Sequence, residues 1–404
     1  MKKFLSIFMV VVLIISVLCG CGKTNTPVNT AEEVVEEAAE PSIKVGLICL
    51  HDEQSTYDLN FISAFKEACD AEGVEYLIKT SVPEGQECYE AANELVDSGC
   101  NIVFADSFGH EDYMIQAAND NPNVQFCHAT GTKAHTEGLS NYHNAFAAIY
   151  EGRYLAGVAA GLKLKDLVAD GAEPLIGYVG AFSYAEVISG YTAFYLGVKS
   201  IVPEVKMKVV FTGSWYDEAM EKEGANSLID TGCVLLSAHA DSMGMPTLCE
   251  ERGVPFVAYN GSFKNACPNT YIISTKINWA PYYKLVIEGV KNGATIPTDW
   301  AGTIINDAVV MTELNESVAA EGTKEALEEV MNQFKANKLK VFDTSTFTVN
   351  GEKVESYLAD VDTDPNYEYD TEVISDGYFH ESEYRAAPYF DMSIDGIELL
   401  NAAY

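Results

Sequence analysis

The sequence predicts an α/β fold made of two consecutive units, each with a parallel β-sheet covered by helices. Short apolar runs rich in β-branched residues, such as "KVGLICL" at 44–50 and "NIVFAD" at 101–106, alternate with helical patterns such as 56–73. A repeated order of strand, helix and strand implies parallel strands joined by right-handed crossovers. After a long helical stretch at 150–167 the alternation restarts with "LIGYVGAF" at 175–182, which predicts a second sheet.

The same two patterns predict each element along the chain. In the first unit we expect strands and helices in turn at 44–50, 56–73, 74–80, 85–99, 101–106, 109–122 and 123–129. In the second unit we expect them at 175–182, 186–201, 206–213, 216–232, 233–239, 242–253, 255–261 and 271–278. A helix at 279–293 follows, and then apolar segments at 298–304 and 308–314 and a charged helix at 322–339. The last 60 or so residues are strand-poor, acidic and tyrosine-rich, and we expect them to pack on the surface.

The N-terminus has the pattern of a secretory signal peptide over residues 1–20. Lys2 and Lys3 precede an apolar run that ends in small residues. The run is short and polar sequence follows it closely, so an uncleaved membrane anchor is the less favoured interpretation. "LCGC" resembles the bacterial lipobox, which predicts acylation of Cys21. Residues 21–42 are polar and acidic and predict a flexible, acylated tether.

The charge balance excludes one class of partner. The chain has 60 acidic and 25 basic residues and a formal net charge of −35. Binding to nucleic acid needs clustered Lys and Arg to contact phosphates, so we expect no nucleic-acid partner.

Of the ten cysteines, Cys49, Cys69, Cys127 and Cys233 lie in apolar strand-like or helical patterns, where cysteine acts as a small hydrophobic residue. With Cys19 removed and Cys21 acylated, we expect most of the remaining eight to be free thiols.

The sequence has no recognisable catalytic constellation. It contains no GxGxxG after the first strand, no GxxxxGK[ST], no GxSxG and no HExxH, and no Cys/His cluster with metal spacing. Asp106, Asp217 and Asp241 follow predicted strands, but aspartates there are as often helix N-caps as acid catalysts. His128 and His239 also fall at strand ends. We therefore expect a binding protein without catalytic residues, cofactor or metal.

Several motifs then carry a resemblance that covers about residues 44–340. "ADSFGHEDYMIQAANDNPNVQFCHATG", "YEGRYLAGVAAGL", "IGYVGAF", "TGSWYDEAM" and "NWAPYY" occur in the order in which the basic membrane protein family carries them. This family comprises substrate-binding lipoproteins of ABC importers for purine nucleosides and related compounds. The resemblance implies the type I periplasmic-binding fold, in which three crossing segments join two Rossmann-like lobes with parallel sheets around a ligand cleft.

The resemblance also implies a division into lobes and a set of partners. We expect an N-terminal lobe at 43–160 plus about 295–340, a C-terminal lobe at 161–294 and an extension at 341–404 that lies outside the resemblance. The expected partners are a small-molecule ligand, the ABC permease and ATPase subunits, and the membrane through the lipid anchor. We expect a monomer on the extracytoplasmic face of the cell membrane, in a Gram-positive anaerobe.

The candidate site follows from the position of polar and aromatic residues at strand ends, since ligands of open α/β sheets bind beyond the carboxyl ends of the strands. Trp215 follows a predicted strand and precedes an acidic helix start, which favours a flat ligand stacked on its ring over a role as core filler. The residues expected to bind the ligand are Tyr57, Ser107, Phe108, Trp215, Asp217, His239, Asp241, Asn260, Asn278 and Trp279.

The expected ligand is a purine, as a base or a nucleoside. Nucleoside-binding members of the family carry an aspartate after the strand corresponding to 255–261, where this chain has Asn260 and Gly261. The first loop, "HDEQSTYDLN", also departs from the Asp-Ser-Phe-Asn of those members, so a nucleobase is as good a candidate as a nucleoside. The alternatives are a ligand-sensing lipoprotein, a binding protein for a flavin, furanone or sugar-like ligand, and, less favoured, a surface nucleosidase.

Overall fold

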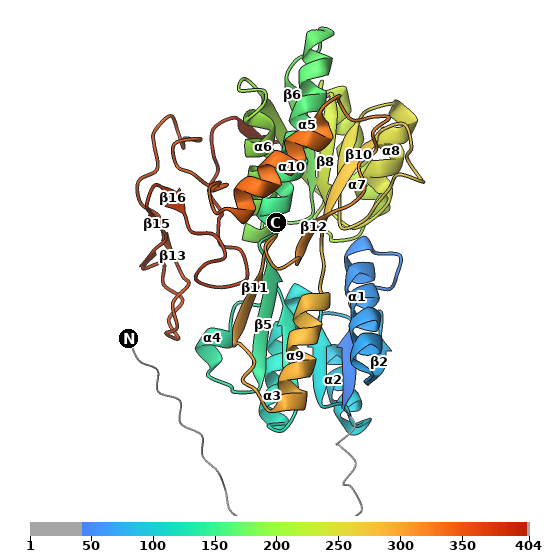
Figure 1. Ribbon diagram of the computed structural model, residues 1–404, viewed down its shortest axis with the longest axis vertical. Coiled ribbons are helices and arrows are strands. Elements are labelled where there is room, and N and C mark those ends of the chain that lie inside the picture. Colours follow the sequence, from blue (N-terminus) through green and yellow to red (C-terminus); the bar gives the residue numbers. More distant parts are fainter. Residues whose placement is uncertain (1–42, 402–404) are drawn as a thin grey trace, which may run out of the picture. The chain divides into compact units, whose positions relative to one another are not determined.

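The structure is a computed structural model that describes residues 43–401 (Figure 1). The predicted signal peptide, the acylation site at Cys21 and the tether lie outside these residues. Within the described part, none of the helices combines the length and the apolar character needed to span a bilayer. The eight cysteines in this part are buried free thiols, as expected.

The first sheet is a six-stranded, fully parallel sheet in the order β11-β5-β4-β3-β1-β2. Its strands are β1 (Lys44–Ile48), β2 (Glu75–Lys79), β3 (Ile102–Ala105), β4 (Gln125–Ala129), β5 (Tyr142–Ala147) and β11 (Asp299–Gly302). The helices of this lobe are α1 (Thr56–Glu72), α2 (Gln86–Asp97), the short η1 (Phe108–His110), α3 (Glu111–Asp120), α4 (Ala134–Glu137) and α9 (Ala280–Asn292). Helices α1 and α9 pack together, as do α2 and α3. Neighbouring side chains of a strand belong to different hydrophobic clusters, with Leu47 beneath α1 and Ile48 beneath α2, so the sheet is covered on both faces.

The second sheet has seven strands in the order β12-β10-β9-β8-β6-β7-β17. They are β6 (Leu175–Gly180), β7 (Lys206–Phe211), β8 (Leu235–His239), β9 (Phe256–Tyr259), β10 (Tyr271–Ile277), β12 (Val309–Met311) and β17 (Ile397–Leu399). Only β12 runs antiparallel to its neighbour. The helices of this second lobe are α5 (Ile149–Ala169), α6 (Ala185–Lys199), α7 (Glu218–Asp230), α8 (Gly244–Arg252) and α10 (Thr323–Lys335). Helices α5 and α6 form one layer and α7 and α8 the other.

The sheets divide the chain differently from the expected boundaries at 160 and 294. Helix α5 packs on α6 and β10 in the second lobe from its first turn, and α9 packs on α1 in the first lobe. Strand β12 and helix α10, expected in the first lobe, join the second sheet and α5. Helix α5 is buried on most sides, so its sequence has no polar face that would indicate which sheet it covers. The chain crosses between the sheets after β5, after β10 and between β11 and β12.

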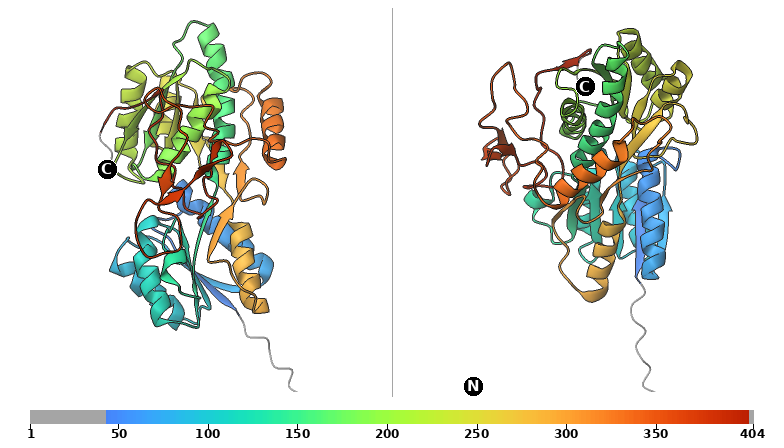
Figure 2. Two further views of the ribbon diagram at one scale, coloured as in Figure 1. Left: turned by 90° about the vertical axis from the view of Figure 1, so that its left-hand side faces the viewer. Right: turned by 45° about the horizontal axis from the view of Figure 1, so that its top comes forward.

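The C-terminal extension packs on the surface of the two lobes (Figure 2). Its buried aromatic residues belong to the same hydrophobic cluster as the core of the lobes. Its short strands are β13 (Leu358–Ala359), β14 (Thr371–Glu372), β15 (Ile374–Ser375) and β16 (Tyr378–Phe379). The rings of Phe342 and Phe390 stack with centroids 4.2 Å apart. The extension reaches both lobes, because Ala386 N donates to Asp299 Oδ1 of β11 at 2.9 Å and β17 pairs with β7 in parallel.

Helices α5 and α6 meet at a pair of glycines, Gly157 and Gly197. A β-carbon added at Gly157 would lie 2.2 Å from Phe194 O, and one added at Gly197 would lie 2.3 Å from Tyr154 O. Because both obstructing atoms belong to the backbone, only glycine allows the two helices to approach this closely.

We therefore expect Gly157→Ala to destabilise the protein. Overpacking of a closely packed contact lowers the free energy of unfolding by about 1–3 kcal/mol, which exceeds the gain in helix propensity. The measurement is equilibrium denaturation, with Lys165→Ala at an exposed position of the same helix as the control. A Gly157→Ala variant as stable as the control would contradict the close backbone contact.

Candidate ligand-binding cleft

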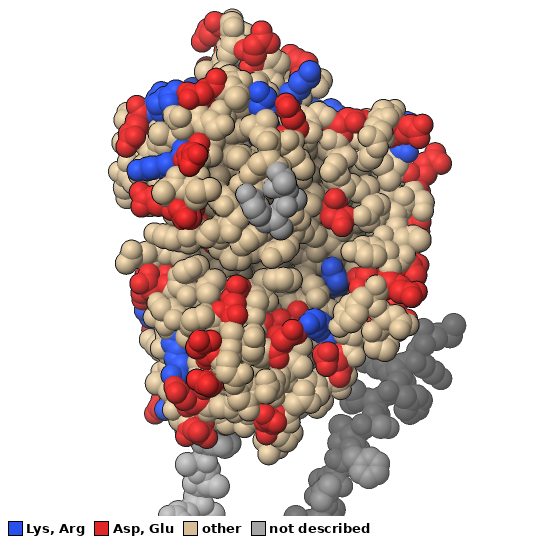
Figure 3. All heavy atoms as spheres, turned by 180° about the vertical axis from the view of Figure 1, so that it is seen from behind, with Lys and Arg blue, Asp and Glu red and all other residues tan. Residues whose placement is uncertain are grey.

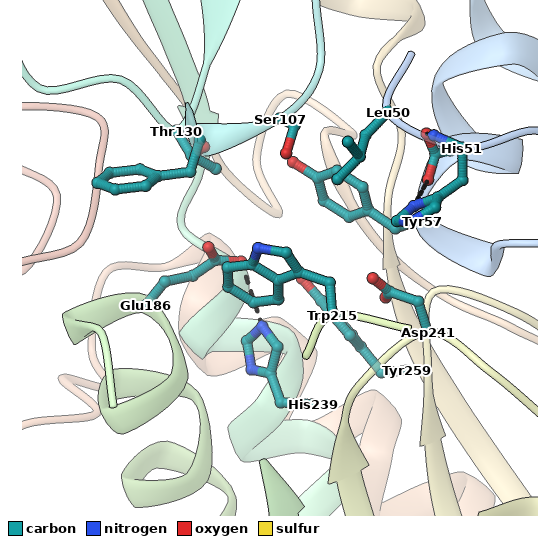
Figure 4. Close-up of a pocket in the computed structure, with 12 residues that line it drawn as sticks. Leu50, His51, Tyr57, Ser107, Thr130, Glu186, Trp215, His239, Asp241 and Tyr259 are labelled. Carbon is teal, nitrogen blue, oxygen red and sulfur yellow. Dashed lines mark hydrogen bonds and ion pairs between the residues drawn. The ribbon is translucent and has the colours of Figure 1, made fainter. Parts of the chain in front are cut away.

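The carboxyl ends of the strands in both sheets meet around one cavity. The first lobe lines it with Leu50, His51, Tyr57, Asp58, Ser107, Phe108 and Thr130. The second lobe contributes Glu186, Trp215, His239, Asp241 and Tyr259 (Figure 4). This is the position at which open α/β sheets bind ligands.

Direct contacts between the lobes hold the cleft closed. Thr56 N, at the start of α1, donates to Asp241 O at 3.3 Å. Asn60 Nδ2 on α1 donates to Asn260 Oδ1 after β9 at 3.0 Å. At the mouth, the rings of Phe108 and Tyr184 lie 5.2 Å apart, and their side chains are 39% and 40% exposed. The cavity is therefore bounded by both lobes and by their contacts.

Trp215 forms part of an aromatic wall. It lies in the loop between β7 and α7, where Gly213 adopts a left-handed conformation with φ of 76° and Trp215 O accepts from Asp241 N at 3.0 Å. Its ring packs edge-on against Phe182, with centroids 5.0 Å apart, and lies 5.9 Å from Tyr184. The indole is half-buried and lines the cavity, so it is available to a flat ligand.

On the first lobe, helix α1 presents Tyr57 and Asp58 to the cavity. Ser55 caps this helix, and its hydroxyl donates to Asp58 Oδ2 at 2.6 Å, while His51 N donates to Asp58 Oδ1 at 2.8 Å. Burial alone would raise the pKa of Asp58, but the hydrogen bonds from His51 and Ser55 hold it below its usual value. Asp58 is therefore a buried, hydrogen-bonded carboxylate.

Behind Asp58 lies a set of possible metal donors. Cys49, Asp58 and Asp106 are buried, with donor atoms within 4.8 Å of one another. Burial, followed by the charge of Asp58, raises the pKa of Asp106 well above its usual value, and burial likewise raises the pKa of the Cys49 thiol. Two of the three groups therefore favour their protonated forms, and a cation bound here would have to displace those protons.

On the second lobe, the cavity wall contains Glu186, His239 and Tyr259 above a buried arginine. His239 Nε2 lies 3.2 Å from Glu186 Oε1. Burial, followed by the positive charge of Arg153, lowers the pKa of His239. Arg153 stacks 3.7 Å over the ring of Tyr259 and donates from Nη1 to Ala238 O at 3.0 Å. The arginine thus supplies positive charge from beneath the cavity without lining it.

Six of the ten residues expected to bind ligand line this cavity. They are Tyr57, Ser107, Phe108, Trp215, His239 and Asp241. Asp217 is instead the N-cap of α7, where its carboxylate accepts from Ala219 N and Met220 N at 3.0 and 2.9 Å. Asn260 faces Asn60 of the other lobe and contributes to closure.

Asn278 and Trp279 lie where the chain leaves β10 and enters the first lobe. Asn278 Nδ2 donates to Asp307 O of another crossing segment at 3.0 Å. Trp279 is 1% exposed and stacks on Phe61 with centroids 4.3 Å apart. The placement of Trp279 among the ligand contacts is therefore corrected, since this tryptophan fills the core of the first lobe.

Sequence reasoning missed six lining residues: Leu50, His51, Asp58, Thr130, Glu186 and Tyr259. All of them lie at a strand end, in the loop after it or in the first turn of the following helix. Two features of the sequence could have identified them as lining residues: their position after a strand, and an acidic residue in the first turn of a helix, as at Asp58 and Glu186. The positive end of the helix dipole favours acidic residues in that turn.

Comparisons with known proteins agree on the fold and the family. Residues 50–340 match the model of the Bmp family, described as ABC transporter substrate-binding protein, PnrA-like. A purine-binding protein of Brucella abortus (strain 2308) is 32% identical over 260 residues, which cover 62% of this chain and 71% of that protein. A putative ABC transporter glucose-binding protein of Haloferax volcanii is 30% identical over 247 residues, covering 61% of this chain and 60% of that protein. A solved ABC transporter solute-binding protein from Conexibacter woesei superposes with a TM-score of 0.61 at 19% identity, covering 74% of this chain and 98% of that one.

The positions of the two tryptophans predict losses of stability of different size. Trp279→Ala should lower the free energy of unfolding by about 3–5 kcal/mol, because it opens a cavity in a packed core. Trp215→Ala removes a half-buried ring at the cleft and should cost about 1 kcal/mol. Thermal and chemical unfolding measure the free energy of unfolding of each variant against that of the wild type. If Trp215→Ala proved the more destabilising of the two, the assignment of Trp215 to the cleft wall would be wrong.

Proposed function

Because the chain belongs to the Bmp family of ABC transporter substrate-binding proteins, we propose that it captures a purine in its interlobe cleft and delivers it to a membrane permease. The main observation in favour of a purine is the aromatic surface of the cavity, with Trp215 on one lobe and Tyr57 and Phe108 on the other. Stacking of a base on an aromatic side chain contributes about 1–3 kcal/mol. The similarity to a purine-binding relative supports the same choice.

The polar groups of the cavity suit the edge of a purine. Asp241, Glu186, Ser107 and Thr130 offer hydrogen-bonding groups around the aromatic faces. A purine has several donors and acceptors in the plane of its rings, so it can satisfy such groups while both of its faces remain in apolar contact.

The charges of the cavity and the residues after β9 restrict the class of ligand further. None of the described residues that line it is Lys or Arg, whereas Asp58, Glu186 and Asp241 are acidic. A phosphate would meet like charge there, which disfavours nucleotides. Asn260 and Gly261 stand where nucleoside-binding members of the family carry an aspartate for the ribose hydroxyls, and this favours the base over the nucleoside.

A sugar is the second candidate, because one relative is named a putative glucose-binding protein. Aromatic rings also pack against the apolar faces of sugars, so the cavity surface alone does not separate the two ligand classes. Its carboxylates could accept hydrogen bonds from sugar hydroxyls.

Calorimetric titration of the compact unit of residues 42–404 tests the ligand. The panel comprises adenine, hypoxanthine, guanosine, inosine, AMP and glucose. We expect the bases to bind most tightly and AMP not to bind. Trp215→Ala should weaken binding by roughly ten- to a hundred-fold, whereas Trp215→Phe, which retains an aromatic face, should lose much less. Binding of glucose without any purine would overturn the purine assignment, and equal affinity of Trp215→Ala and wild type would remove Trp215 from the site.

We also propose that the protein acts at the extracytoplasmic face of the membrane, held by acyl chains on Cys21. The acidic surface supports attachment by acylation rather than by charge, since Asp and Glu are spread over the face seen in Figure 3 with Lys and Arg interspersed among them. Anionic membranes attract basic segments and repel acidic ones.

Cys21→Ser should therefore leave the precursor unprocessed and without lipid. Metabolic labelling with a radioactive fatty acid, followed by electrophoresis, measures both properties. Cys19→Ser serves as the control, because that residue precedes the expected cleavage point and should tolerate the exchange. Normal labelling of the Cys21→Ser protein would show that the anchor lies elsewhere or is absent.

A further inference from the structure

Asp241 is an acidic side chain buried inside the cleft. It follows β8, is 6% exposed and lies in the cavity wall opposite His51 and Tyr57 (Figure 4). Its backbone is fixed on both sides, since Asp241 N donates to Trp215 O at 3.0 Å and Asp241 O accepts from Thr56 N at 3.3 Å. The position of its carboxyl group is therefore set by the closed cleft.

The groups around Asp241 carry mostly negative charge. Three acidic residues on three helices act on it electrostatically: Asp58 of α1, Glu221 of α7 and Glu186 of α6. The positive group that faces it is Arg153 of α5, which already stacks on Tyr259 and donates to a backbone carbonyl. The other titratable side chains that line this cavity are His51, Tyr57, His239 and Tyr259.

Burial and the neighbouring carboxyl groups act in the same direction on the pKa of Asp241. Burial raises the pKa of its carboxyl group well above the usual value, and the negative charges of Asp58, Glu221 and Glu186 raise it further, against the opposing effect of Arg153. Asp58 differs because His51 and Ser55 donate hydrogen bonds to its carboxylate. In the closed cleft the lowered pKa of Asp58 favours its ionised form, and the raised pKa of Asp241 favours its neutral form.

We propose that Asp241 recognises the purine as a neutral carboxylic acid, which donates its O–H to an acceptor on the edge of the base and accepts from the neighbouring N–H. This inference rests on the proposed function. A neutral carboxyl group presents one donor beside one acceptor. Adenine offers the complementary pair at ring N1 and the 6-amino group, and hypoxanthine at O6 and N1–H. An ionised carboxylate has acceptors only and would leave the purine acceptor unpaired in a buried site.

The consequence is that purine capture takes up a proton. In the open form Asp241 would be in contact with water and would titrate at a lower pH than in the closed, occupied form. Between these two pKa values the empty protein must bind a proton as the cleft closes, so the affinity falls by up to about tenfold for each unit rise in pH. An asparagine at this position also presents a donor beside an acceptor and does not titrate.

The experiment is calorimetric titration of the full mature chain in mild detergent with adenine and hypoxanthine from about pH 5.5 to 8. Repeating it in two buffers of different ionisation enthalpy counts the protons taken up. We expect the wild type to take up as much as one proton and to bind more weakly as the pH rises. Asp241→Asn should bind within about threefold of the wild type at pH 5.5 and show no dependence on pH, while Asp241→Ala should be weaker by about tenfold throughout. Asp217→Asn, at the cap of α7 outside the cavity, is the matched control and should behave as wild type.

Two results would overturn the inference: wild-type affinity that does not change with pH, or an Asp241→Asn variant as weak as Asp241→Ala. Circular dichroism of each variant separates a binding effect from misfolding. Failure of every purine to bind the wild type would overturn the proposed function instead. In that case the proton count with the ligand that does bind still decides the state of Asp241.

Discussion

The desolvation of acidic side chains where two parallel sheets meet is the physical constraint on which this cleft depends. Asp58, Asp106 and Asp241 are buried where the lobes meet, and each buried carboxyl group must be hydrogen-bonded or neutral. Asp58 meets the requirement through Ser55 and the backbone of His51. Asp106 meets it in part through Leu50 N, which donates to its Oδ1 at 3.1 Å, and in part through a raised pKa. Asp241 lies in the wall of the cavity, where we propose that it meets the ligand.

This constraint connects ligand binding with closure. The contacts that hold the lobes together include the hydrogen bonds from Thr56 to Asp241 and from Asn60 to Asn260 and the ring contact of Phe108 with Tyr184. A ligand shifts an equilibrium between open and closed forms only by contacts made in the closed form. A purine stacked on Trp215 and paired with Asp241 would touch both lobes and relieve the burial of an acid, so closure and recognition would share the same atoms.

The C-terminal extension adds a second link between the lobes, on the side of the crossing segments. It is anchored to the second lobe by β17 and by Asn401, whose side chain bonds both the N–H and the carbonyl of Phe211 at 2.9 and 2.7 Å. On the first lobe Asp299 accepts from Ala386 N. Since the family match ends at residue 340, this link is a feature of the chain beyond the region that it shares with the family.

The sequence by itself determined the order of strands and helices and the presence of two parallel sheets, because alternation and helical periodicity are local consequences of burial. It also placed Trp215, Asp241 and His239 at strand ends. It could not place Trp279 correctly, because the chain crosses to the other lobe directly after β10 and carries that ring under α1. The lobe covered by α5, the facing of Asp58 towards Asp241 and the buried arginine under Tyr259 were likewise decided only by tertiary structure. They depend on which surfaces meet after the chain has crossed between the lobes. A local pattern of residues contains no information about contacts between segments that are far apart in the sequence.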